Sequence, residues 1–303
     1  MKLIALLVGL VVERLATQLF HFRELRWLDR IIDVGFRQVD RFANWPALIP
    51  VVILAVVLVL PVLAVVFGLG DALFGFPYLL LAVIVLFFSL GPKDIGEDVD
   101  EYCKALEAED EEEIRKTAKA LAEKDLPSDP LERIPMVEEA VCVQANNRLF
   151  AVIFWFVLLG PIGAWCYRVT DLIRRRAVFN AARDDDANKT ADTVLEAAGQ
   201  LHGWLAWIPA RLTAIGYAMA GSFDGALSAW RMSEGAAAKT QSEQSEALLA
   251  RVGTGALALQ SNEGESACDR AVRGATAANG LVFRLLFIWA AVIAAMTLYG
   301  WSV

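Results

Sequence analysis

The chain has few of the residues that soluble enzymes use for chemistry. Its 303 residues include only two histidines and four cysteines, and charged residues make up 21%. The cysteines are far apart and form no CxxC pair: Cys103, Cys142, Cys166 and Cys268. With His21 and His202 as the chain's only histidines, this spacing predicts no metal site. We expect free thiols in a reducing compartment, with Cys166 as a packing residue; the sequence alone leaves a disulfide open.

What the chain has instead is long apolar runs. Hydrophobic residues make up 57% of it and the mean hydropathy is +0.47, which is typical of membrane proteins. Runs 45–68, 149–166 and 281–299 approach or exceed the length of about 20 residues that spans a bilayer. A fourth run, 72–90, follows the first so closely that we expect a tight antiparallel hairpin. The sequence therefore predicts an all-α, polytopic membrane protein with about four to five hydrophobic helices.

The N-terminal apolar run is less clear. Its core, residues 3–12, is short and is interrupted by Glu13 and Arg14. Because no small-residue cleavage pattern follows, we expect a retained helix rather than a signal peptide.

Charge is unevenly distributed along the chain. Segment 21–45 combines five arginines with Leu25, Leu28, Ile32 and Phe36 at helical spacing, which predicts an amphipathic helix on the cytoplasmic membrane surface. Segment 91–147 has 17 acidic and seven basic residues. This surplus of negative charge argues against nucleic acid or anionic lipid as its partner, and we interpret it as a solvated helical face.

The acidic segment has the pattern of amphipathic helices. Val99 and Ile114 each begin an apolar series at helical spacing, which predicts two soluble helices. Ser128 or Asp129 is the expected N-cap of the next helix, with Pro130 at its first position. From Met136 onward one helix can continue directly into the third apolar run.

That run, "NNRLFAVIFWFVLLGPIGAWCYRV" at 146–169, contains a Gly-Pro-Ile-Gly break. If it crossed the membrane completely, Arg174, Arg175 and Arg176 would lie outside, against the positive-inside tendency. A broken or re-entrant element that bends back at Gly160 and Pro161 removes this conflict. An arginine cluster on the far side of the membrane is the alternative.

A further apolar stretch, 201–221, contains Arg211. An arginine in the middle of a lipid-facing helix costs about 2.5 kcal/mol or more. We therefore expect Arg211 to face protein, water or the membrane interface, where Trp204 and Trp207 would also suit.

Several separated motifs identify the chain as similar to the AmpE family of bacterial inner-membrane proteins. These are "LLVGLVVERL", "WIPARL", "YAMAG", "ALSAW" and "FRLLFIWAAVIAAMTLYG", in the family's order. The resemblance implies a regulator linked to β-lactamase induction, and hence to cell-wall damage or peptidoglycan recycling. It also implies a multi-pass protein of the bacterial inner membrane.

The CobD/CbiB proteins of cobalamin biosynthesis resemble the chain more distantly, in "ALEAEDEEEIRKTAKALAEKD", the Gly-Pro break with its Tyr-Arg pair, and "WIPARLTA". That kinship implies an alternative function, the ATP-dependent adenosylcobinamide-phosphate synthase reaction. The branch's acidic motif at the membrane entrance is largely replaced here by "EAVCVQANNR". Glu139 matches, but Val143 and Asn147 stand where acids are expected. Neutral residues bind metal or activate a nucleophile poorly, so a regulator is favoured over an enzyme.

We expect one membrane-embedded domain, residues 1–303, with cytoplasmic helical segments 91–147 and 170–280. The candidate ligand-binding residues are Glu139, Gln144, Asn146, Asn147, Arg148 and Arg211. We predict that they line a cytoplasm-facing cavity in which the arginines take an anion such as a phosphate. The alternative is that they cap and anchor helix ends.

No catalytic residue is assigned, and a nucleotide or phosphorylated molecule is the expected ligand. Expected partners are the lipid bilayer, an unidentified cell-wall or β-lactamase regulatory protein, and a second copy in a homo-oligomer; nucleic acid is not expected. A transporter would be a third class, but no internal repeat supports it.

Overall fold

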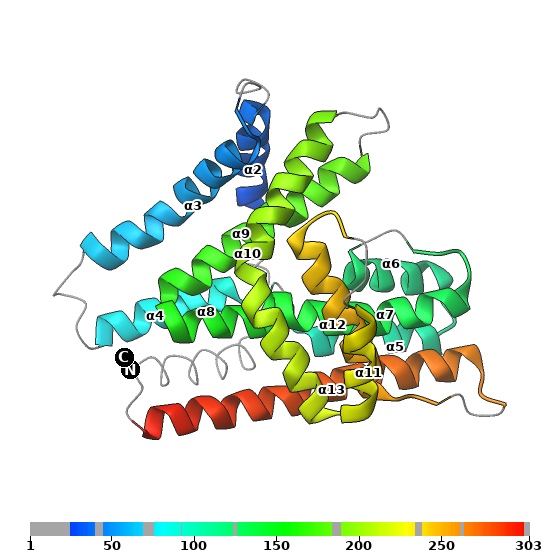
Figure 1. Ribbon diagram of the computed structural model, residues 1–303. Helices are drawn as coiled ribbons and strands as arrows, with labels where there is room; N and C mark the ends of the chain where they lie inside the picture. Colours follow the sequence, from blue (N-terminus) through cyan, green and yellow to red (C-terminus); the bar gives the residue numbers. More distant parts are fainter. Residues whose placement is uncertain are drawn as a thin grey trace.

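The computed structural model describes residues 25–39, 45–68, 76–91, 93–123, 126–183, 189–233, 238–260 and 264–299. Within these ranges the regular elements are helices (Figure 1). Three of them are long and apolar enough to cross a bilayer: Leu48–Gly68, Pro130–Leu159 and Ala267–Leu298. A shorter apolar helix spans Pro77–Ser89. The protein is thus an all-α membrane protein, as predicted, while the expected N-terminal helix lies outside the described residues.

The first described helices pack around a later one. Helix α2 (Arg26–Val39) packs on α3 (Leu48–Gly68), and α4 (Phe76–Ser89) follows. Helices α3 and α4 reverse direction as expected, but each packs mainly on α9 (Pro161–Arg183), so the predicted tight hairpin is wrong.

Helix α2 is amphipathic, but its apolar face does not lie on lipid. Leu28, Ile32 and Phe36 are buried in one cluster with residues of α3 and α9. Arg176 of α9 donates a hydrogen bond from Nε to Asp33 of α2 at 2.7 Å. This hydrogen bond holds the pKa of Asp33 below its usual value, more than burial raises it. The predicted membrane-surface position of this face is therefore wrong, because the face is covered by protein.

The acidic segment forms three helices with defined caps: α5 (Ile95–Glu107), α6 (Glu111–Ala122) and α7 (Pro130–Ala145). Asp94, Asp110 and Asp129 each accept hydrogen bonds from backbone N–H groups of the first turn. A carboxylate at a helix start satisfies free N–H groups and complements the helix dipole. Of the two predicted caps for α7, Asp129 is the one used, with Pro130 following it.

The helix of α7 continues through a π-turn, η4 (Asn146–Phe150), into α8 (Ala151–Leu159). It then breaks at Gly160, whose φ of 69° lies in the left-handed region that favours glycine. Helix α9 starts at Pro161 and packs closely against α8. The close approach needs a glycine, because a Cβ at Gly163 would lie 2.4 Å from the Trp155 carbonyl oxygen. The predicted break in this run is confirmed.

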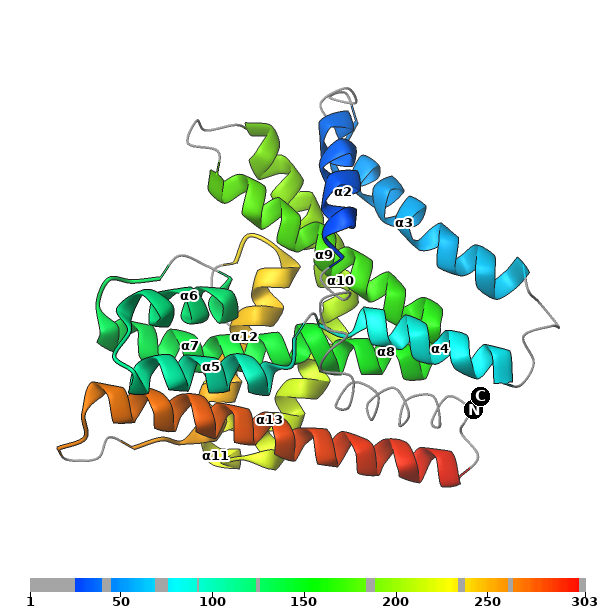
Figure 2. The same cartoon turned by 180° about the vertical axis from the view of Figure 1, so that it is seen from behind.

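The C-terminal half adds α10 (Lys189–Ala220), α11 (Phe223–Ser233), α12 (Gln241–Leu257) and α13 (Ala267–Leu298). Helix α12 packs on α10, α11 and α7. Helix α13 begins beside α5 and α7 and extends away from them, which Figure 2 shows from behind. The end of α3, the start of α4, the turn between α8 and α9 and the end of α13 all lie on the left of Figure 1, opposite α5, α6 and α12.

Candidate functional site

A group of polar side chains is enclosed where α5, α6, α7, η4, α9, α10 and α12 meet. Its members are buried or half-buried although most can ionise or hydrogen-bond. We call this group the polar cluster: Asp98, Glu123, Gln144, Asn146, Asn147, Arg148, Tyr167, Arg168, Asp171, Arg174, Arg175, His202, Thr213, Ser242 and Glu246. Burying so many polar groups is costly unless they satisfy one another, so their contacts define what the cluster can do.

The π-turn η4 contributes the central residues. Asn146, Asn147 and Arg148 are consecutive and all buried. A wider turn changes the helical register, and such turns are frequent at functional sites. The Asn146 Nδ2 group donates to Asn147 Oδ1 at 3.1 Å, and Thr213 Oγ1 donates to Asn146 Oδ1 at 3.0 Å. The asparagines therefore connect the turn to α10.

A histidine extends this hydrogen-bonded chain to α12. His202 Nδ1 lies 2.8 Å from Ser242 Oγ, and its Nε2 lies 3.1 Å from the Tyr167 hydroxyl. Tyr167 in turn donates to Asn147 Oδ1 at 3.3 Å. Burial, together with the positive charge of Arg174, lowers the pKa of His202 to about 3. The imidazole is therefore neutral at physiological pH.

Ion pairs hold the opposite side of the cluster. Arg148 Nη1 donates to Asp98 Oδ2 of α5 at 2.7 Å, and Arg148 Nε donates to Gln144 Oε1 at 3.0 Å. Lys93 Nζ lies 3.2 Å from the other Asp98 oxygen. The buried guanidinium of Arg148 thereby connects η4, which lies between α7 and α8, to α5.

One face of α9 supplies most of the remaining charge. Asp171 is fully buried between Arg168, at 2.9 Å, and Arg174, at 3.1 Å. Arg174 also pairs with Glu246 of α12 at 3.0 Å, and Arg175 pairs with Glu123. With His202 neutral, four arginines face four carboxylates, so the cluster is balanced in charge.

Some buried donors in the cluster have no hydrogen-bond partner within the protein. These include Asn147 Nδ2, Arg174 Nε and Arg175 Nε. Arg175 Nε still lies 3.6 Å from Asp171 Oδ2, a distance that allows charge attraction. Native proteins leave few buried polar atoms unsatisfied, and those that remain call for a water, an ion or a ligand. The cluster therefore offers donor groups to a molecule with oxygen acceptors.

The structure brings four of the six predicted site residues together. Gln144, Asn146, Asn147 and Arg148 belong to the polar cluster. Glu139 lies on the exposed side of α7. It is the neighbouring Glu138 that is buried, where it pairs with Arg270 of α13.

Arg211 stands apart from these four and interacts with its own helix. Its guanidinium stacks on the ring of Trp207, 3.9 Å from the centroid, and donates to the Trp207 carbonyl at 3.1 Å. Trp207 and the neighbouring Trp204 are both exposed. Such stacking and backbone bonding suit an arginine near a membrane interface. Whether any of the six residues binds a ligand stays a prediction.

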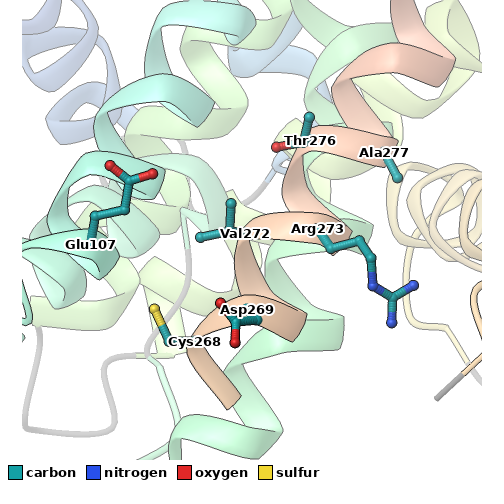
Figure 3. Close-up of a pocket in the computed structure, with 7 residues that line it drawn as sticks. All are labelled: Glu107, Cys268, Asp269, Val272, Arg273, Thr276 and Ala277. Atoms are coloured by element: carbon teal, nitrogen blue, oxygen red, sulfur yellow. The ribbon is translucent and has the colours of Figure 1, made fainter. Parts of the chain in front are cut away.

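A surface depression lies elsewhere, where the start of α13 meets the end of α5 (Figure 3). It measures about 540 Å³ and is lined by Glu107, Cys268, Asp269, Val272, Arg273, Thr276 and Ala277. It shares no residue with the polar cluster. Within the described part of the chain, no group of three or more His, Cys, Asp or Glu side chains is arranged to hold a metal ion.

Sequence reasoning missed much of the cluster, including Asp98, Glu123, Asp171, His202 and Glu246. One signal was available in "YRVTDLIRRR". There Arg168, Asp171, Arg174 and Arg175 recur every three or four residues, which places them on one helix face. Opposite charges sharing a face predict ion pairs between them, but their burial follows only from how α9 packs.

Comparison with known proteins places the chain in a family. The whole chain, residues 1–303, matches the family described as "Regulatory signalling modulator protein AmpE". The chain belongs to the AmpE family. This confirms the resemblance predicted from the separated motifs, and it agrees with a helical membrane fold. Among solved structures, none matches this AmpE-family protein.

A curated relative of this AmpE-family protein is the "Cobalamin biosynthesis protein CobD" of Stutzerimonas stutzeri (strain A1501). The two are 27% identical over 153 residues, which is 50% of this chain and 48% of the relative. The match thus spans about half the length of that protein. It fits the predicted kinship between the two branches.

Proposed function

We propose that this AmpE-family protein is a multi-pass inner-membrane regulator linked to β-lactamase induction, and that it responds to cell-wall damage or peptidoglycan recycling. The observation that carries the proposal is the whole-chain match to a family described as a regulatory signalling modulator. The three candidate membrane spans support a position from which such damage can be signalled.

In this proposal the ligand binds to the polar cluster. Its buried donors that lack a hydrogen bond within the protein suit an anionic or phosphorylated ligand. It also joins helices of the membrane part, through η4 and α9, to the acidic helices and α12. Binding at this junction changes contacts in both parts, which is what a membrane signalling protein requires.

A complementation experiment tests this proposal. A host strain without its own copy receives the wild type, Arg175→Gln, Arg211→Ala or the exposed-site control Lys116→Gln, each at equal membrane levels by immunoblot. We expect β-lactamase activity after an inducing antibiotic to change in Arg175→Gln and not in Lys116→Gln. If Arg211→Ala loses function and Arg175→Gln keeps it, the ligand site lies near Arg211 instead. Wild-type activity in both site variants would contradict a ligand role for either position.

A second candidate function is favoured by the similarity to the CobD protein. In this alternative the protein is a membrane enzyme related to the ATP-dependent adenosylcobinamide-phosphate synthase. Purified protein would then be stabilised against heat by ATP with Mg²⁺ and would release phosphate. Because Val143 and Asn147 replace the expected acids, we expect no phosphate release above background; release that Arg175→Gln abolishes would favour the enzyme.

A further inference from the structure

Three arginines from two helical segments converge on one carboxylate. Arg148 Nη2 lies 3.6 Å from Glu123 Oε1, Arg174 Nη2 lies 3.8 Å from Glu123 Oε2, and Arg175 donates a hydrogen bond to Oε1. The first two distances allow charge attraction but exceed normal hydrogen-bond lengths. Glu123 therefore shares one negative charge among three arginines and leaves part of their hydrogen-bonding capacity unused.

Glu123 is also the least enclosed of the four carboxylates in the polar cluster. Its side chain is 23% exposed, against 14% for Glu246, 11% for Asp98 and none for Asp171. Unlike them, Glu123 lies outside a helix. It caps the C-terminus of α6 with a φ of 53°, a left-handed conformation that is unfavourable for a non-glycine residue. Its backbone N–H donates to the Lys119 carbonyl oxygen at 2.9 Å, so the helix cap holds the backbone while the side chain is the most exposed of the four carboxylates.

The arginine trio can accept more oxygen atoms than Glu123 offers. Arg174 Nε and Arg175 Nε are buried and have no hydrogen-bond partner. A carboxylate has two oxygens, whereas a phosphate group presents three or four in a tetrahedral array. Arginine guanidinium groups bind phosphate through paired N–H groups. When Glu123 leaves, four arginines face three carboxylates, so an incoming anion restores the charge balance.

We propose that Arg148, Arg174 and Arg175 form a site for a phosphate group, and that the Glu123 carboxylate occupies this site until a phosphate-bearing ligand displaces it. The inference rests on the proposed function in taking the polar cluster as the ligand site. Because Glu123 ends α6, its displacement frees that end of the helix and transmits ligand binding to the acidic helices.

Anion binding by the purified full-length protein tests the proposal. Thermal unfolding in detergent is followed as inorganic pyrophosphate is added at constant ionic strength, for wild type, Glu123→Gln and the control Glu112→Gln in the first turn of α6. We expect Glu123→Gln to reach half-saturation at about tenfold lower pyrophosphate concentration than wild type. This figure takes the wild-type site to be free of the Glu123 carboxylate about one-tenth of the time, which makes its apparent affinity about tenfold weaker. Glu112→Gln should match wild type, since Glu112 is exposed. Equal half-saturation in all three proteins would overturn the proposal.

Two further variants keep the test valid if Glu123→Gln does not fold, and they test whether Arg175 binds the anion. Glu123→Asp keeps the charge but shortens the reach, so it should also bind pyrophosphate more tightly than wild type. Adding Arg175→Gln to either Glu123 variant should abolish the response. A response that survives without Arg175, or a Glu123→Asp protein that behaves as wild type, would place the anion elsewhere.

The phosphate could belong to a soluble ligand or to a lipid headgroup, and a second arm separates these sources. The same proteins are reconstituted in phosphatidylcholine nanodiscs with and without phosphatidic acid. Stabilisation of Glu123→Gln by phosphatidic acid but not by pyrophosphate assigns the site to a lipid, and the reverse assigns it to a soluble ligand. Binding without an effect on β-lactamase induction would leave the site in place and refute only the proposed function.

Discussion

At the scale of single residues, the buried charges of the polar cluster determine how substitutions change stability. Removing one partner of a buried ion pair leaves the other charge uncompensated, at a cost of about 3–5 kcal/mol. Arg148→Met leaves Asp98 without its main partner, and Lys93 at 3.2 Å compensates only in part. We therefore expect a loss of about 3 kcal/mol in the free energy of unfolding, measured by denaturation in mixed detergent micelles.

A double-mutant cycle provides the control for this expectation. The double variant Arg148→Met with Asp98→Leu removes both charges and should recover part of the lost stability. Lys116→Met breaks an exposed pair with Glu113 and should change stability little. If the Arg148 and Lys116 variants are equally stable, the polar cluster is not a stabilising group.

The neutral His202 predicts a dependence of stability on pH. Its pKa in the folded protein is about 3, and in the unfolded chain it is about 6.5. Between these values the unfolded chain binds a proton that the folded protein does not. Stability is therefore fully present above pH 6.5 and falls as the pH is lowered, by about 1.4 kcal/mol per pH unit.

Unfolding of wild type at pH 7.0 and 5.0 measures this slope, and His202→Gln should flatten it. Lys116→Gln, which changes an exposed side chain that does not titrate in this range, is the control and should leave it unchanged. A slope that persists in His202→Gln would mean that other groups carry the pH dependence.

The sequence could identify site residues that stand out from their neighbours in the chain, but not those that meet only through helix packing. Asn146, Asn147 and Arg148 interrupt an apolar run, so their polarity marks them without knowledge of the fold. Arg148 pairs with Asp98 across 50 positions, and His202 contacts Tyr167 across 35. Such contacts depend on how the helices pack, which composition and spacing do not specify.

At the scale of helices, the sequence predicted where helices begin and end better than it predicted which helices pack together. The Asp129 cap and the Gly160 break follow from side-chain and backbone preferences of a few residues, and both are present. The sequence could not show that α9 would separate α3 from α4, or that α2 would pack against protein. Apolar surface alone does not distinguish lipid from a protein neighbour, since both bury it.

The turn between α8 and α9 gives a prediction at this scale. In Gly163→Ala the added Cβ would lie 2.4 Å from the Trp155 carbonyl oxygen and 2.7 Å from the Leu159 Cβ, so the two helices must separate. Overpacking of this kind costs about 1–3 kcal/mol, which should appear as a lower Tm in detergent. Gly280→Ala is the control, because nothing lies within 4 Å of its Cβ and alanine favours a helix. A Tm for Gly163→Ala at or above that of Gly280→Ala would contradict this packing.

At the scale of the whole molecule, the bend at Gly160 turns the chain back, so that the arginines of α9 lie beside α6 and α12. Helices α8 and α13 extend in the same direction, away from the acidic helices, and α9 returns from that end (Figure 1). Arg174 and Arg175 are thereby brought back to the acidic helices, where they meet Glu246 and Glu123. Because these two arginines are paired inside the protein, we predict that they do not flank the far side of the membrane, which would remove the conflict with the positive-inside tendency.

This arrangement predicts which positions share a membrane face. In a chain whose four native cysteines are replaced, Glu112→Cys on α6 and Ala182→Cys on α9 are exposed and should lie on the cytoplasmic face. Leu298→Cys, at the far end of α13, replaces a side chain that is 88% exposed and should lie on the opposite face. A membrane-impermeant maleimide should therefore label Leu298→Cys in intact spheroplasts and label the other two only after lysis. If Ala182→Cys is labelled from the same face as Leu298→Cys, α8 and α9 together cross the membrane completely. That result would refute the prediction that α9 returns to the side from which α8 starts.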